Sequence, residues 1–254
     1  SKTAELFLQL FRGSEKAHGF FEIISNRNDG KKQGKAVTIK TSGPTVSLWE
    51  KHLAGEYGLG VIPINDDNNC YWGCIDVDVY PLDFLELVAK IKKLKLPLVV
   101  CRSKSGGAHV FLFVSDAVTA GEMQDKLREI AAGLGFGGLE IFPKQRQVLA
   151  GRGDIGSWLN MPYFGGADST RYGVSPKGDA LTIEQFLTFV KKRKITPDKL
   201  YNLEVATIDN LEHGPPCLKI LLKQGFPEGT RNNGLFNIAV YLKKAYPEKW
   251  ESRL

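Results

Sequence analysis

The stretch that decides the fold is Gly73-Cys74-Ile75-Asp76-Val77-Asp78-Val79-Tyr80. Apolar and acidic residues alternate in it, which is the period of a β-strand with one apolar face. Successive side chains of a strand point to opposite faces. The two carboxylates therefore share one face, and three β-branched residues anchor the other.

The spacing of Asp76 and Asp78 favours metal binding. Their Cα atoms are expected roughly 7 Å apart along a strand, so both carboxylates can converge on one pair of cations. Two bare carboxylates at that distance repel each other unless positive charge lies between them. Hard oxygen ligands suit Mg²⁺ or Mn²⁺. The alternative is a solvated strand face, because an isolated Asp-x-Asp is a loose motif.

The composition is that of an ordinary globular protein. The chain has 254 residues, 43% hydrophobic and 24% charged, so we expect one large domain, alone or with a small appendage. No apolar run approaches the roughly 18 residues of a membrane span, and residues 1–5 do not resemble a signal peptide, which predicts a cytoplasmic protein without membrane association. A net charge of +6 mildly favours a polyanionic partner.

Four unevenly spaced cysteines indicate a reducing compartment rather than a disulfide framework. Cys70 and Cys74 would lie about 13 Å apart on one strand, too far for a shared metal or a disulfide. We interpret both as buried thiols.

Hydrophobic periodicity and turn residues predict a chain of alternating helices and strands. Helices are expected over 3–12, 44–53, 81–93, 119–132, 182–192, 217–223 and 230–244. Strands are expected over 19–25, 35–40, 57–64, 75–79, 96–102, 108–114, 139–142 and 157–162. Thr119 and Glu122 form a capping box at the start of one helix. We place a domain boundary within 197–213, and we interpret the end of the chain as a truncation inside a helical module.

The second informative stretch is 101–110, Cys-Arg-Ser-Lys-Ser-Gly-Gly-Ala-His-Val. Its two glycines let backbone N–H groups approach a ligand closely. Hydrogen-bond donors surround the turn, as a triphosphate requires; they are Arg102, Lys104, Ser105 and His109. A histidine at a strand start is usually structural, but its neighbours here favour binding.

The third stretch, 139–145, carries Glu140 between apolar residues on a short predicted strand. A surface glutamate is the simple interpretation. If this strand lies beside the Asp76 strand, Glu140 becomes a third metal ligand and Lys144 can meet phosphate.

An acid pair, a Ser…His element and a third acid, in this order, resemble the archaeo-eukaryotic primase superfamily of primase-polymerases. The resemblance extends over roughly residues 5–175 and is to its phage and mobile-element branch. It includes 10–13, 49–53 with 58–61, 140–145 and 158–164. The chain departs from many relatives in having Glu140 rather than Asp as the third acid, which affects metal spacing.

The resemblance implies an α/β (α+β) catalytic domain over 1–205, with two small β-rich modules around a cleft, and a truncated helical accessory module over 206–254. Its implied activity is primer synthesis and extension on a single-stranded DNA template, from ribo- or deoxynucleoside triphosphates, with two Mg²⁺ or Mn²⁺ ions. A helicase, fused or separate, is a further partner compatible with it, and we expect the fragment to be a monomer.

The resemblance also implies residue roles. The metal ligands and catalytic residues are Asp76, Asp78 and Glu140. The nucleotide-binding residues are Arg102, Lys104, Ser105, Gly106, His109, Lys144 and Asn160. Weaker candidates for nucleic-acid contact are Tyr163, Arg171, Arg231 and Asn232.

Several alternatives stay open. Asn160 and Tyr163 could belong to a packed loop, and Arg231 and Asn232 could cap a helix. A two-metal nuclease would use the same acids but has less need of the Ser105–His109 turn. A non-catalytic nucleic-acid-binding module would need no acids, and Trp72, Trp158 and Tyr163 could then be stacking platforms.

Overall fold

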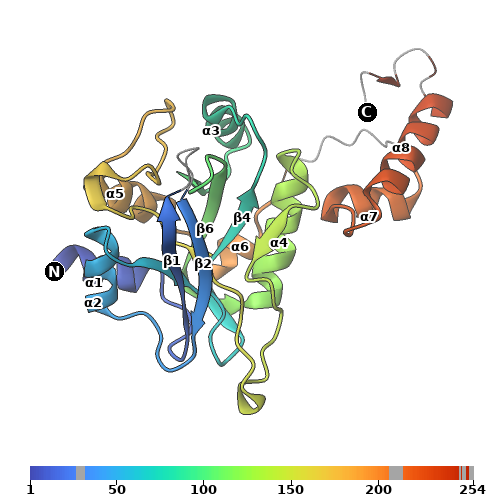
Figure 1. The fold of residues 1–254 in the computed structure, drawn as a ribbon. Coiled ribbons are helices and arrows are strands. Elements are labelled where there is room, and N and C mark those ends of the chain that lie inside the picture. The colour runs from blue at the N-terminus through green and yellow to red at the C-terminus, as the bar shows by residue number, and fades with distance from the viewer. Residues whose placement is uncertain (27–31, 206–213, 246, 248–249, 252–254) are drawn as a thin grey trace.

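The computed structural model describes residues 1–26, 32–205, 214–245, 247 and 250–251. The described strands form two four-stranded sheets, and neighbouring strands within each sheet run antiparallel. The predicted mixed α/β fold is confirmed, with the two sheets as its β-rich modules and helices at the C-terminal end (Figure 1).

The first sheet has the strand order β2-β1-β3-β8. Its strands are β1 (His18–Asn26), β2 (Lys32–Ile39), β3 (Gly58–Val61) and β8 (Leu159–Asn160). β3 and β8 are shorter than predicted. Gly19 and Gly60 face each other across β1 and β3, and a Cβ at either would lie within 2.2 Å of the Trp158 ring. Glycine is required at both positions because the indole covers the backbone there.

The second sheet has the order β5-β6-β4-β7. Its strands are β4 (Asn69–Val77), β5 (Leu98–Arg102), β6 (Ala108–Thr119) and β7 (Glu140–Phe142). β4 lies between β6 and β7, so the acidic stretch is central in this sheet. The strand ends at Val77, and Val79 is exposed rather than anchored in the core, which corrects part of the predicted alternation.

Seven of the described helices were predicted, with ends that differ by up to three residues, whereas α6 was not predicted and lies in the stretch expected to be a domain boundary. They are α1 (Lys2–Leu10), α2 (Val46–Leu53), α3 (Phe84–Lys93), α4 (Ala120–Gly133), α5 (Ile183–Arg193), α6 (Pro197–Tyr201), α7 (Pro216–Gln224) and α8 (Arg231–Ala245). The Thr119–Glu122 capping box of α4 is confirmed. α3 begins three residues later than predicted, because Asp83 is its N-cap and accepts from the Glu86 N–H.

The two faces of the second sheet bury different cores. Ile75 and Val77 lie in an aliphatic cluster with residues of α3 and α4, as the strand period predicts. Trp72 and Cys74 lie in an aromatic cluster shared with α1, α2, α5 and the first sheet. Truncating a buried aromatic of this cluster, such as Phe11, would destabilise the fold by about 3–5 kcal/mol. Asp76 follows Cys74 on the aromatic face, so the first acid points toward the side where the two sheets meet.

The C-terminal helices α7 and α8 pack on each other through Leu218, Ile238 and Leu242, and α7 also contacts α4 (Figure 1). The predicted domain boundary at 205/206 borders residues 206–213, which lie outside the described residues. Within the described parts of the chain, no helix is long and apolar enough to cross a bilayer. Cys70 and Cys74 are buried free thiols, as predicted.

Candidate active site

Four residues from four strands form one row across the second sheet. Cys101 on β5 pairs with His109 on β6, His109 pairs with Asp76 on β4, and Asp76 pairs with Glu140 on β7. Directly paired residues of an antiparallel sheet point to the same face. The predicted condition for Glu140 is therefore met: its strand lies beside the Asp76 strand, in register.

The carboxyl group of Asp76 has a raised pKa. Burial raises its pKa to about 7, and the charges of Asp78 and Glu140 add to this, while Lys144 opposes it. A carboxyl group surrounded by like charge in this way is suited to a cation, which would favour its ionised form.

His109 is buried, and its Nε2 lies 3.5 Å from Asp76 Oδ1. Burial, together with the Arg171 charge, lowers the His109 pKa to about 4, while the Asp78 charge acts in the opposite direction. The imidazole is therefore neutral at neutral pH, and its contact with Asp76 is not an ion pair.

Asp78 lies just beyond the end of β4, beside the 103–107 turn. The turn is closed by the Ser103 N–H donating to the Gly107 carbonyl at 2.8 Å, and Gly106 has a φ of 97°. A Cβ at Gly107 would lie 2.2 Å from the Val77 carbonyl oxygen. Glycine is therefore what lets this turn approach the end of the acidic strand. Ser105 Oγ lies 3.5 Å from Asp78 Oδ1.

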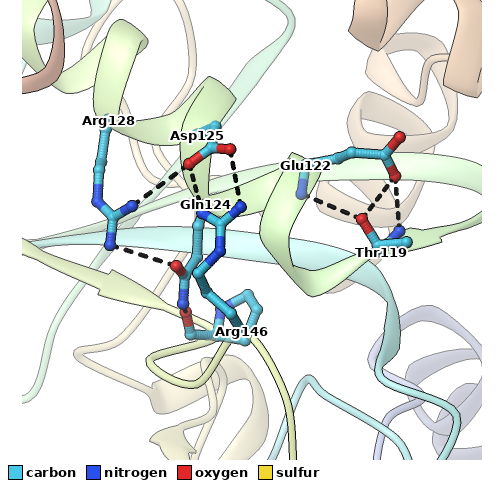
Figure 2. A network of polar contacts seen from close by, with 7 residues as sticks. Thr119, Glu122, Gln124, Asp125, Arg128 and Arg146 are labelled. Atoms are coloured by element: carbon cyan, nitrogen blue, oxygen red, sulfur yellow. Dashed lines mark hydrogen bonds and ion pairs between the residues drawn. The ribbon is translucent and has the colours of Figure 1, made fainter.

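Glu140 is exposed and forms an ion pair with Lys144, whose Nζ lies 2.9 Å from a carboxylate oxygen. A polar network supports the loop that follows β7 (Figure 2). The buried Gln124 amide donates to the Pro143 carbonyl at 2.8 Å. The Arg146 guanidinium binds both carboxylate oxygens of Asp125, at 2.5 and 3.0 Å. Helix α4 thus holds the segment that carries Glu140 and Lys144.

Arg102 and Lys104 lie on either side of the turn's start. Arg102 Nη1 donates to the Thr170 carbonyl at 3.2 Å, which ties β5 to the 170–173 segment. Lys104 Nζ lies 3.0 Å from the centre of the Phe21 ring on β1. A residue of the predicted phosphate turn therefore contacts the first sheet directly.

Two of the predicted binding residues have a buried polar atom without a hydrogen-bond partner in the described structure. These atoms are Arg171 Nη1 and Asn160 Oδ1. Arg171 is only 8% exposed and stacks on the Phe164 ring at 4.9 Å. Burial lowers its pKa to about 10, so it remains a cation. A buried, incompletely paired guanidinium is energetically unfavourable, and such groups are typical of ligand sites.

The remaining weak candidates make other contacts. Tyr163 is buried in the aromatic cluster, and its hydroxyl donates to the Leu181 carbonyl and accepts from the Gly173 N–H. This placement agrees with the packed-loop alternative for Tyr163, because both hydroxyl contacts are used within the protein. Arg231 donates to the Gly138 carbonyl, and Asn232 is exposed on the first turn of α8.

The donor set fits a hard divalent cation by its chemistry, because the charges of Asp78 and Glu140 both act on the Asp76 carboxyl group. As placed, no three His, Cys, Asp or Glu side chains of the described residues form a ready metal cluster. The Glu140 ion pair with Lys144 gives a reason, since its carboxylate is turned to the ammonium.

Sequence reasoning missed Tyr80. Its hydroxyl lies 2.9 Å from Asp78 Oδ1 and 2.5 Å from Ser105 Oγ. A tyrosine two residues after an acid carries no recognisable motif, so only the folded backbone reveals this contact.

Comparison with known proteins identifies the family. Residues 3–203 match the family model described as "TOTE conflict system, Archaeo-Eukaryotic Primase domain". The search of curated proteins gave no match.

Solved structures with a similar fold include the archaeo-eukaryotic primase domain of the cyanophage S-2L primase-polymerase. It is 12% identical, with a TM-score of 0.39, over 74% of this chain and 97% of that one. The catalytic domain of the primase RepB′, solved in complex with initiator DNA, is 11% identical, with a TM-score of 0.36, over 76% of this chain and 92% of that one. With two thirds or more of its residues matched by the family model, this chain belongs to the archaeo-eukaryotic primase domain family of TOTE conflict systems.

Proposed function

We propose that this chain is a DNA-dependent primase-polymerase that joins nucleoside triphosphates into primers on single-stranded DNA and extends them. The observation that carries the proposal is the row His109–Asp76–Glu140, with Asp78 and the 103–107 turn at the same end of β4. Carboxylates beside a glycine-containing turn of donors suit the reaction of a triphosphate better than hydrolysis of a phosphodiester.

In this proposal Asp76, Asp78 and Glu140 would hold Mg²⁺ or Mn²⁺. Such ions, when bound, favour deprotonation of the attacking 3′-hydroxyl and neutralise charge on the pyrophosphate leaving group. Glu140, which is now paired with Lys144, would be a ligand of the cation, and the Lys144 ammonium would then be available to a phosphate oxygen.

The phosphates would lie against the 103–107 turn and the buried guanidinium of Arg171. The Ser105 hydroxyl donates to phosphate oxygens, and Lys104 and Arg102 add positive charge nearby. Arg171 supports this assignment, because its Nη1 has no hydrogen-bond partner among the described residues and its charge acts on His109. An anion would complete the hydrogen bonding of this guanidinium.

The DNA template is the proposed macromolecular partner, in keeping with the net charge of +6. Both candidate contacts of the helical module, Arg231 and Asn232, are exposed, and Arg231 donates to the Gly138 carbonyl. We expect a chain ending at residue 205 to lose initiation more than extension. Parallel assays with and without a supplied primer measure this, and an equal loss in both would contradict an accessory role for α7 and α8.

The test of the main proposal is a primer-synthesis assay on single-stranded DNA with labelled nucleotides and Mn²⁺ or Mg²⁺. It compares the wild type with Asp76→Ala/Asp78→Ala. Asp116→Ala is the matched control, since Asp116 is an exposed aspartate near the far end of β6. A primase would make product without a supplied primer. Only the double variant would lose this product, and the Asp116→Ala control would keep it.

Other results would redirect the proposal. Product only with a supplied primer would indicate a polymerase without priming. Shortening of the DNA that depends on the two acids would favour a two-metal nuclease. Wild-type incorporation by the double variant would refute the assignment of Asp76 and Asp78, and no reaction in any sample would leave a nucleic-acid-binding module.

A further inference from the structure

Ser105 contacts the hydroxyl group of Tyr80, a residue outside the proposed metal and nucleotide ligands. Ser105 Oγ lies 2.5 Å from the Tyr80 hydroxyl and 3.1 Å from Ser103 Oγ. Tyr80 follows the end of β4, and about half of its surface is exposed. Its hydroxyl is therefore held at the site by polar contacts rather than by burial of its ring.

Counting protons restricts what these contacts can do. A phenol has one proton to donate and can also accept, whereas an ionised carboxylate only accepts. Asp78 Oδ1, at 2.9 Å, and Ser105 Oγ therefore compete for the single Tyr80 proton. When the proton is donated to Ser105, the serine acts as acceptor on that side, and its own proton remains for a third group.

That third group, if the proposed function holds, is a phosphate oxygen of the incoming nucleotide. A free serine hydroxyl rotates among several orientations, and fixing one of them before binding reduces the entropy lost on binding. The turn itself is fixed by the Ser103–Gly107 hydrogen bond, so the hydroxyl rotation is the freedom left to restrain.

We propose that Tyr80 is a positioning residue that orients the Ser105 hydroxyl toward the triphosphate. This inference rests on the proposed function, since it assigns the Ser105 partner as nucleotide phosphate. Tyr80 acts through Ser105, and it contributes to nucleotide affinity rather than to the chemical step.

The experiment is a double-mutant cycle of Tyr80→Phe and Ser105→Ala, read by calorimetric titration with ATP and dATP in EDTA and again in Ca²⁺. Tyr80→Phe keeps the exposed ring and removes the hydroxyl alone. We expect it to weaken nucleotide binding about fivefold, the effect of one hydrogen bond, and to have no further effect in the Ser105→Ala background. Tyr201→Phe is the control, because this exposed tyrosine lies on α6.

Steady-state incorporation adds a second readout. In Tyr80→Phe the KM for nucleotide should rise by the same factor while kcat at saturating nucleotide stays within about twofold of wild type. Unchanged affinity, or additive effects of the two substitutions, would overturn the role of Tyr80 while leaving the proposed function intact. A wild type that binds neither nucleotide would overturn both.

Discussion

His52 should make the stability of this fold depend on pH below neutrality. The side chain is fully buried, its Nδ1 accepts from the Leu59 N–H at 3.1 Å, and its Nε2 donates to the Pro162 carbonyl at 2.9 Å. This pattern favours a neutral imidazole with its proton on Nε2, because a second proton would remove the acceptor that Leu59 uses. The Tyr57 carbonyl, 3.3 Å from Nδ1, opposes this only in part, since the His52 pKa is lowered on balance. Burial lowers the His52 pKa to about 4, and the Arg171 charge acts in the same direction.

The sign and size of the effect follow from linkage. The folded pKa of about 4 lies below the ordinary value of 6.5, so the unfolded chain binds the proton more readily between these values. The contribution of His52 to stability is therefore complete above pH 6.5 and is lost as pH falls toward 4. The two pKa values correspond to a loss of about 2 kcal/mol between pH 7.5 and pH 5, and about 3 kcal/mol by pH 4.

Urea unfolding of the wild type and of His52→Gln at several pH values isolates the contribution of His52 to the free energy of unfolding. Asp76 and His109 also titrate with shifted pKa values, but they are present in both proteins and cancel in the difference. Glutamine cannot titrate, so the stability advantage of the wild type should shrink by about 2 kcal/mol from pH 7.5 to pH 5. A difference that stays constant over this range would refute the assignment of His52 as a buried neutral imidazole.

Three other substitutions test the site and its support. Arg171→Met removes a buried, incompletely paired charge. We therefore expect an equal or higher melting temperature, together with weaker binding of ATP by calorimetry. A large loss of stability would indicate that Arg171 is a structural cation instead. Gln124→Leu leaves the Pro143 carbonyl without its donor and should lower unfolding free energy by about 1–3 kcal/mol in urea titrations, whereas no change would mean that another donor replaces it. Gly60→Ala would place a Cβ 2.2 Å from the Trp158 ring, and we expect a loss of about 1–3 kcal/mol with a changed tryptophan fluorescence spectrum; unaltered stability and fluorescence would contradict this packing.

Local patterns predicted the parts of the fold that depend on local chemistry. The alternation around Asp76 gave a strand in the right place and the correct faces for Ile75 and Val77, because the two-residue period is set by the backbone itself. It extended the strand too far, since β4 ends at Val77 and Val79 is exposed. The capping box at Thr119 was predicted correctly for the same reason, since its hydrogen bonds join residues three apart. The start of α3 was wrong, because Pro81 and Asp83 are both good starting residues and only the cap hydrogen bond decides between them.

Features that depend on pairing between distant segments could not be predicted in this way. The register that places Glu140 opposite Asp76 joins residues on strands far apart in the chain, and the sequence offered it only as a condition. The burial of Tyr163 depends on helix α5 and the 173–181 segment, which a motif-level resemblance does not describe. The unpartnered atom of Arg171 is likewise visible only once the surrounding backbone is in place.

The row of residues across the second sheet determines which changes of length the chain can tolerate. Because the side-chain period of a strand is two, inserting or deleting one residue within β7 would turn Glu140 to the opposite face while leaving its strand hydrogen bonds available. A residue added in the 133–139 connector would leave this pairing unchanged, since a loop absorbs the extra length. Across related chains, insertions and deletions should therefore accumulate in the connectors and be excluded from the short strands.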